Sequence, residues 1–374
     1  MLIQRHEQKH IEKTLASNLV AIVYGARQVG KTTLAKEVAK QFASPLYLNC
    51  DNPNVVISLT NKSAVELKSY IGTADLVIID EGQRVENIGI TIKLIHDTYP
   101  EIKLLVTGSS SLDLANKITE PLTGRSEEII LYPLSIGEVS NNRSEMDAHW
   151  RTMLDRGGYP AIWQLSAQDA HKRLSSIANN YVYRDAFGPQ VMFDQTVIND
   201  LLRLLAYQIG HEVSYGELAG KLSISKETVM RYVDLLEKAF IVQRLGQYRR
   251  NQRVEVGRLR KIYFTDLGIR NAIIDNFKPL ETRDDTGALW ENFCVIERFK
   301  YLQAQERRVR SFYWRNGDQR EIDMIEEESD ALRAYETKLG LKKTVRVPLA
   351  FSRMYPDYTF EVVNPDTFFD ILLA

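Results

Sequence analysis

The chain has 374 residues, of which 44% are hydrophobic and 26% are charged, and 48 Lys and Arg nearly balance 49 Asp and Glu. This composition is typical of a folded globular protein, and at roughly 150 residues per domain the length predicts two to three domains. The net charge of -1 excludes a uniformly basic nucleic-acid coat, but not a local basic patch. The two cysteines lie far apart, and no apolar run approaches the roughly 20 residues that cross a bilayer. We therefore expect a cytoplasmic protein without a membrane partner.

The first 135 residues alternate short apolar, β-branched runs with helical patterns. This alternation predicts an α/β fold in which helices cover a parallel sheet. The predicted strands are residues 19–24, 46–49, 76–80, 103–107 and 128–131.

A complete phosphate-binding loop pattern follows the first predicted strand. Its residues are Gly25, Ala26, Arg27, Gln28, Val29, Gly30, Lys31 and Thr32, and Thr33 opens a helix predicted over residues 33–42. Glycines let the backbone curl around a polyphosphate, and the helix adds its positive N-terminal end. We expect Lys31 to bind the β- and γ-phosphates of ATP and Thr32 to ligate Mg²⁺. The alternative is a glycine-rich loop without a nucleotide.

Two acids end the buried strand 76–80. Because ligands of open α/β sheets bind at the carboxyl ends of the strands, we expect Asp80 to hold Mg²⁺ through water. Glu81 then polarises the attacking water as general base. One strand intervenes in sequence between the loop strand and this one, as in hydrolysing ATPases of the AAA+ type. A solvated carboxylate pair at a turn is the alternative.

Two further residues are candidates for catalysis. Ser109, or Ser110 beside it, follows the strand 103–107 and can donate to the attacking water or the γ-phosphate. Arg125 precedes the last strand and can act as an arginine finger on the γ-phosphate of a neighbouring copy, which implies a homo-oligomer. The alternatives are a serine-rich turn that caps a helix and an ordinary surface arginine.

Together these residues resemble a prokaryotic AAA-type ATPase family. The resemblance covers nearly the whole chain and includes Gly157-Gly158-Tyr159-Pro160, Arg184-Asp185, Tyr263-Phe264-Thr265-Asp266-Leu267-Gly268 and Tyr313-Trp314-Arg315. Members of that family typically carry a C-terminal domain of unknown function, similar in fold to PD-(D/E)XK nucleases. The resemblance implies the fold and ATP binding, but no cellular role.

Residues 213–222 and 226–239 have the pattern of two helices joined by a short turn, which is the spacing of a helix-turn-helix. The segment that follows, residues 244–261, is rich in basic residues, and it places Arg249, Arg250 and Arg253 where the wing of a winged helix contacts DNA phosphates. Tyr248 is available there to stack on a base. A winged helix that binds a protein, with a solvated basic loop, is the alternative.

The C-terminal part has the pattern of a helix over residues 289–300 and then of strands over 309–315, 321–326 and 332–338. A turn centred between residues 329 and 330 places Asp323 opposite Glu336, and Glu321 opposite Lys338, on one face of the sheet. Two acids on such a face bind Mg²⁺ for phosphodiester cleavage, and Lys338 orients the attacking water. With Glu291 on the helix, these residues match the nuclease pattern. A nuclease-like fold that no longer cuts, with a face of ion pairs, is the alternative.

We expect four parts: a P-loop AAA+ domain over residues 1–135, a helical lid over 136–208, a winged-helix domain over 209–270, and a restriction-endonuclease-like α/β domain over 271–374. The leading hypothesis is an ATP-hydrolysing molecular switch with ATP and Mg²⁺ as cofactors, acting on DNA or regulated by it. An ATP-gated nuclease, and a nucleotide-sensing regulator with little turnover, are the alternatives.

Overall fold

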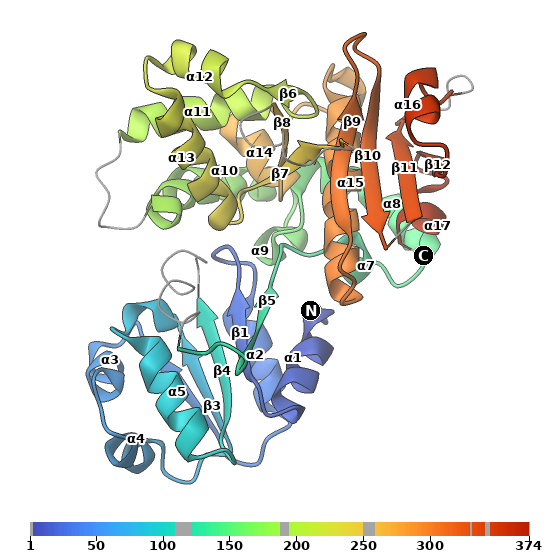
Figure 1. The fold of residues 1–374 in the computed structure, drawn as a ribbon. Helices are drawn as coiled ribbons and strands as arrows, with labels where there is room; N and C mark the ends of the chain where they lie inside the picture. The colour runs from blue at the N-terminus through green and yellow to red at the C-terminus, as the bar shows by residue number, and fades with distance from the viewer. Residues whose placement is uncertain are drawn as a thin grey trace. The chain divides into compact units, whose positions relative to one another are not determined.

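The computed structural model describes residues 3–108, 121–187, 194–249, 259–329, 331–340 and 345–373, with the backbone alone for 180–187. The chain divides into two compact units, one formed by residues 1–132 and the other by most of residues 133–374. Figure 1 shows the elements of both units. In the part of the chain that is described, none of the helices combines the length and apolar character that a bilayer crossing requires.

The first unit is a parallel sheet of five strands with the order β2-β3-β4-β1-β5. Every residue of β1 and β3 is buried, which requires helices on both faces of the sheet. The strands are β1 (Val20–Tyr24), β2 (Pro45–Asn49), β3 (Leu76–Asp80), β4 (Lys103–Gly108) and β5 (Ser126–Ile130). The helices are α1 (Glu7–Ala16), α2 (Lys31–Ala39), α3 (Pro53–Leu59), α4 (Ala64–Ile71) and α5 (Ile88–Thr98).

The predicted α/β class and parallel sheet are confirmed, and each predicted strand lies within two residues of the observed one. The helix predicted over 33–42 instead begins at Lys31 and ends at Ala39. It begins earlier because Gly30 is its N-terminal cap and takes the left-handed conformation, with φ 102°.

The second unit is built on a mixed sheet of seven strands with the order β12-β11-β10-β9-β7-β8-β6. Its strands are β6 (Glu212–Val213), β7 (Val242–Gln247), β8 (Arg260–Phe264), β9 (Arg310–Arg315), β10 (Glu321–Glu328), β11 (Ala331–Thr337) and β12 (Thr359–Val363). The parallel pairing of β7 with β9 makes one sheet out of strands that the sequence assigns to two domains.

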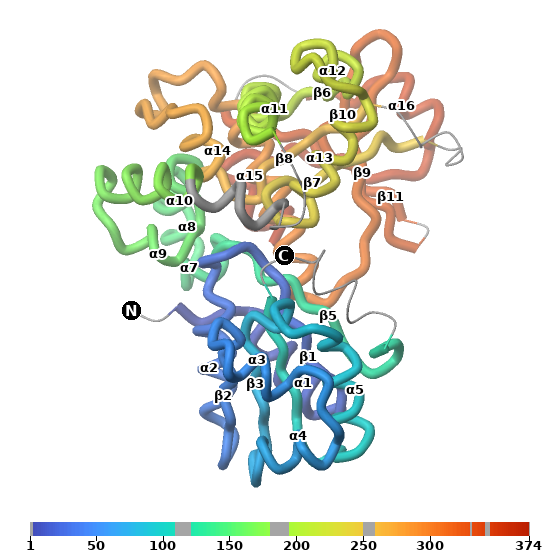
Figure 2. The backbone as a smooth tube through the Cα atoms, turned by 90° about the vertical axis from the view of Figure 1, so that its left-hand side faces the viewer, coloured from blue at the N-terminus to red at the C-terminus, as the bar shows by residue number. Residues whose placement is uncertain are grey.

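Helices precede and interrupt these strands. They are α7 (Ile136–Val139), α8 (Arg143–Arg156), α9 (Pro160–Trp163), α10 (Ala167–Phe187), α11 (Gln195–Tyr207), α12 (Tyr215–Leu222), α13 (Lys226–Lys238), α14 (Leu267–Ile273), α15 (Thr286–Ala304), α16 (Leu349–Met354) and α17 (Phe368–Leu372). Helices α8, α10 and α14 pack together (Figure 2). The helix predicted from Val213 begins two residues later, because Val213 pairs with Arg260 in the sheet and Ser214 caps the helix.

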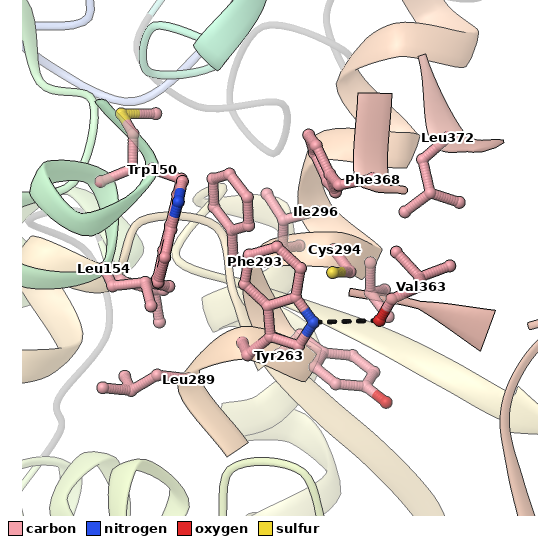
Figure 3. Packing of buried hydrophobic residues seen from close by; sticks show 14 of the residues in the cluster. Trp150, Leu154, Tyr263, Leu289, Phe293, Cys294, Ile296, Val363, Phe368 and Leu372 are labelled. Carbon is pink, nitrogen blue, oxygen red and sulfur yellow. Dashed lines mark hydrogen bonds between the residues drawn. The ribbon is translucent and has the colours of Figure 1, made fainter. Parts of the chain in front are cut away.

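Aromatic side chains of α8, α15 and α17 form the main core of the second unit (Figure 3). The rings of Trp150 and Trp290 meet edge to face with centroids 5.4 Å apart, and Phe293 stacks on Phe368 at 5.1 Å. The indole of Trp290 donates to the carbonyl of Val363 at 3.2 Å, the contact dashed in Figure 3. Since this core fixes α15 against β12, the acids carried by α15 and the sheet are held on a rigid framework.

Candidate functional site

The phosphate-binding loop connects the end of β1 to the start of α2. A Cβ atom at Gly25 would lie 2.3 Å from the carbonyl oxygen of Leu131, so only glycine fits where the loop passes β5. Gln28 takes a left-handed conformation with φ 61°. Lys31 is buried, and its ammonium donates to the carbonyls of Gly25 and Ala26 at 2.8 Å each. The loop thus has the curled shape that its sequence predicts.

Asp80 lies at the carboxyl end of β3, two strands from β1 in the sheet. The hydroxyl of Thr32 donates to its Oδ2 at 2.8 Å, and so does that of Tyr47 at 2.5 Å. The hydroxyl of Thr107, at the end of the intervening strand β4, donates to its Oδ1. A threonine hydroxyl and a carboxylate are oxygen ligands of the kind that Mg²⁺ takes beside a polyphosphate, so the residues present fit this ion.

Glu81 follows Asp80 in a left-handed conformation with φ 56°, which is uncommon for a residue with a side chain. Its backbone N–H donates to the Thr107 hydroxyl at 3.3 Å, and its Oε2 accepts from the Gln83 amide at 2.6 Å. The backbone turn and these two contacts fix the carboxylate next to Asp80. Such an orientation suits a base that must meet one water molecule.

Arg5 is a part of this site that sequence reasoning missed. Its guanidinium donates to the carbonyl of Val29 in the loop and to that of Tyr132 beyond β5, at 2.7 Å each. Arg5 therefore joins the loop to the end of the first unit. Its only local signal was a positive charge near the start of the chain, which does not distinguish it from surface residues.

The remaining predicted catalytic residues do not join the site. Arg125 precedes β5, at the end of the sheet opposite to the loop, and its Nε donates to Asp97 Oδ1 at 2.8 Å. Ser109 and Ser110 lie outside the described residues. Arg125 cannot act on a nucleotide in its own chain, so its predicted role requires a second copy.

The predicted basic edge of the helix-turn-helix region is only partly exposed. Tyr248 is not available to stack on a base, because its ring packs on Phe312 and Tyr355 and its hydroxyl donates to Glu327. The Nε and Nη2 of Arg249 donate to Gln247 Oε1 at 3.0 and 2.7 Å, while Arg250 and Arg253 lie outside the described residues. The apolar residues that recur at helical spacing in α13, Val229, Val233 and Leu236, are buried, and so is Ala239 just after the helix.

A second cluster of polar residues lies where α15 meets the seven-stranded sheet. Carboxylate oxygens of Glu291, Glu321 and Asp323 lie within 4.8 Å of one another. The predicted register of β10 and β11 is confirmed, since Met324 pairs with Tyr335 and the series continues to Glu328 and Ala331. Asp323 Oδ2 accepts from the backbone and the hydroxyl of Thr337, at 2.8 Å each.

Glu336 and Lys338 complete the predicted nuclease set at this face. Lys338 Nζ donates to Glu336 Oε1 at 2.7 Å. Burial and the charge of Asp323 raise the pKa of Glu291 and of Glu336 to about 7 each. Glu291, Asp323, Glu336 and Lys338 therefore lie together at this face.

Lys261, from β8, fills the centre of this cluster and was not predicted there. Its side chain is fully buried, its Nζ lies 2.7 Å from Glu291 Oε1, and it also contacts Glu321. Burial alone would lower the pKa of Lys261, but the carboxylates hold that pKa well above its usual value. In the sequence this lysine appears as one of several cations in a basic segment, and nothing local marks it as buried.

Fold and loop together define a Walker-type AAA ATPase domain, and comparison with known proteins agrees. Residues 17–140 match the AAA domain family AAA_14, residues 147–280 match a domain of unknown function (DUF8612), and residues 286–366 match another (DUF4143). The chain thus carries an AAA P-loop ATPase domain followed by two domains of unknown function.

Two relatives and one solved structure illustrate how far the similarity extends. The uncharacterized protein Rv2008c of Mycobacterium tuberculosis is 29% identical over 343 residues, which cover 90% of this chain and 74% of the relative. The uncharacterized protein MJ1637 of Methanocaldococcus jannaschii is 25% identical, with 82% and 72% covered. The Walker-type ATPase PABY2304 of Pyrococcus abyssi has a similar fold, with a TM-score of 0.51 and 15% identity over 73% of this chain and 96% of that one.

Proposed function

We propose that this protein is an ATP-binding and ATP-hydrolysing molecular switch of the AAA type. The observation that carries the proposal is the hydrogen bond between Thr32 of the loop and Asp80 of β3, which supports a metal-binding role for this pair beside the phosphate loop. Lys31 exchanges its two loop carbonyls for β- and γ-phosphate oxygens when ATP binds. Thr32 and Asp80 would hold Mg²⁺, which would supply positive charge to the phosphates.

Hydrolysis follows from the position of Glu81. A water oxygen forms a bond to the γ-phosphorus while the bond to the ADP oxygen breaks, and the Glu81 carboxylate accepts the water's proton. Gln83 and Thr107 are positioning residues, because each of them contacts Glu81. Release of phosphate then removes the group that holds the loop in its ATP-bound form, as in other nucleotide switches.

Steady-state ATP turnover tests this proposal. The wild type should hydrolyse ATP only with Mg²⁺, and Lys31→Ala should lose ATP binding together with turnover. Lys40→Ala is the matched control, because Lys40 is exposed directly after α2 and its ammonium pairs with Glu37. Equal turnover in the wild type and in Lys31→Ala would refute the proposal.

We also propose that the region from α11 to β8 is a winged helix that contacts DNA. The order α11-β6-α12-α13-β7-β8, with β6 and β7 on either side of β8, supports this assignment. Two acids of α13 turn toward Arg244, since Asp234 lies 3.0 Å from its Nη2 and Glu237 contacts its Nε. The exposed charged residues of α13 are then three cations, Lys226, Arg231 and Lys238, and one acid, Glu227, so this face carries an excess of positive charge.

Duplex binding at increasing salt tests this second part. The wild type should bind with a steep salt dependence, and reversing the charges of Arg249, Arg250 and Arg253 should weaken binding and flatten that dependence. Arg173→Glu, an exposed position on α10, serves as a control. Turnover measured with duplex and single-stranded DNA shows whether DNA regulates the ATPase. Unchanged binding after charge reversal would refute DNA contact through this segment.

A further inference from the structure

The cluster of Glu291, Glu321 and Asp323 offers the carboxylate oxygens that a divalent ion requires, but an ammonium group already occupies the space between these oxygens. The ammonium of Lys261 lies 2.7 Å from Glu291 Oε1 and 3.8 Å from Asp323 Oδ1, and it contacts Glu321 Oε1 as well. The carboxylates therefore share one cation that belongs to the chain itself.

A divalent ion does not fit beside that ammonium. Ligand oxygens lie about 2.0–2.1 Å from Mg²⁺, so an ion bound by all three carboxylates would have to stand close to the Lys261 nitrogen. Two like charges at such a distance repel strongly, above all where water is excluded. Lys261 is fully buried, so its ammonium cannot move into solvent without opening the sheet.

The charged groups around the cluster also argue against a bound metal ion. Arg315 Nη1 lies 3.5 Å from Glu321 Oε2 and 2.8 Å from Glu212 Oε2, and Lys338 bonds to Glu336. Tyr263 donates its hydroxyl to the Glu291 oxygen that also accepts from Lys261. The chain's own donors thus satisfy the acids that a metal would otherwise neutralise.

We propose that Lys261 occupies the metal position of this nuclease-like face, so that the protein as it exists is not a metal-dependent nuclease. The ammonium instead ties β8 to α15 and β10, which joins the helix-turn-helix region to the C-terminal part of the sheet. The cluster is a latent metal site that removal of one side chain would open. This inference is independent of the ATPase proposal, since it concerns none of the residues at the phosphate loop.

Binding of Mn²⁺ to the full chain without nucleotide tests the proposal, read by the electron paramagnetic resonance of the free ion. Neither the wild type nor Asp323→Asn should bind Mn²⁺ at this cluster. Lys261→Met should gain about one Mn²⁺ per chain, and Lys261→Met with Asp323→Asn should lose that gain. Lys338→Met removes a neighbouring lysine that is partly exposed, and it should gain no site.

Thermal unfolding supplies a second readout. Lys261→Met leaves buried carboxylates without their cation and should have a lower Tm than the wild type. Mn²⁺ should restore roughly 5 °C of that loss in Lys261→Met and have no effect on the wild type. If Lys261→Met does not fold, Lys261→Gln, which keeps a donor, replaces it in both measurements.

Two results would overturn the inference. One is Mn²⁺ binding by the wild type that Asp323→Asn abolishes, because a metal would then share the site with the lysine. The other is a folded Lys261 variant that gains no Mn²⁺ site, because the lysine would then not be what keeps the metal out.

Discussion

The hydroxyl of Thr32 lies 2.8 Å from Asp80 Oδ2, although the two residues are 48 positions apart in the chain. The Thr107 hydroxyl holds the other oxygen of the same carboxylate, and β4, which carries Thr107, lies between the two strands that end at the site. The order of the strands therefore brings together the two residues that we propose bind the metal. This arrangement reduces the reorganisation that nucleotide binding requires.

Arg5→Ala should weaken ATP binding about tenfold, because it removes two hydrogen bonds that a charged group makes to the loop and to Tyr132. Equilibrium titration with a fluorescent ATP analogue measures the effect. Lys9→Ala on the exposed side of α1 is the control and should bind like the wild type. An unchanged affinity in Arg5→Ala would show that the loop keeps its shape without this clamp.

Arg125→Ala should lower turnover roughly a hundredfold or more and leave ATP affinity almost unchanged, as expected for an arginine finger that acts in trans. Lys103→Ala is the control, since Lys103 is at the same end of the sheet and contacts Asn18. Mixing Arg125→Ala with Lys31→Ala tests the trans geometry, because one chain then binds ATP and the other supplies the arginine. A mixture no more active than its separate components would exclude that role.

Gly158→Ala should lower the stability of the second unit by roughly 1–3 kcal/mol, because the added Cβ would lie 2.1 Å from the carbonyl oxygen of Leu134. The Tm of the second unit's unfolding transition measures this loss. Gly220→Ala is the matched control: no atom stands within 4 Å of its added Cβ, and it should be neutral or slightly stabilising. A Gly158→Ala protein as stable as the wild type would contradict the close approach of Gly158 to the carbonyl of Leu134.

Asp285→Asn should destabilise the protein at pH 7 by roughly 2 kcal/mol or less. Burial would raise the pKa of Asp285, but hydrogen bonds from Arg283 and Arg270 outweigh it and lower that pKa to about 2. A carboxyl whose pKa falls on folding stabilises the protein above its unfolded pKa, and this contribution is lost as the pH drops through the folded value.

The Tm difference between the wild type and Asp285→Asn should therefore be constant from pH 7 to about pH 5, and it should shrink between about pH 4 and pH 2. Asp284→Asn, at the exposed neighbouring position, is the control. A Tm difference that grows as the pH falls would contradict a lowered pKa of Asp285 in the folded protein.

Local patterns predicted the parts of this protein that depend on local chemistry. The loop from Gly25 to Thr32 follows one apolar strand, Asp80 ends another, and the turn near Ser329 sets the register that brings Asp323 opposite Glu336. Contacts between distant segments were not predictable in this way. The pairing of β7 with β9, the clamp by Arg5 and the burial of Lys261 depend on packing that no local pattern records. The prediction that Tyr248 is available to stack on a base was wrong for the same reason, since its partners Phe312 and Tyr355 lie more than 60 positions away in the chain.

ATP turnover by Glu81→Gln, measured together with the nucleotide that stays bound, tests the central claim most directly. The amide cannot accept the proton of the attacking water, so we expect Mg²⁺-ATP to bind and to remain unhydrolysed, with turnover reduced roughly 10²–10⁴-fold. Turnover equal to that of the wild type, with ADP formed at the same rate, would contradict the assignment of Glu81 as the base and with it the proposed hydrolytic site.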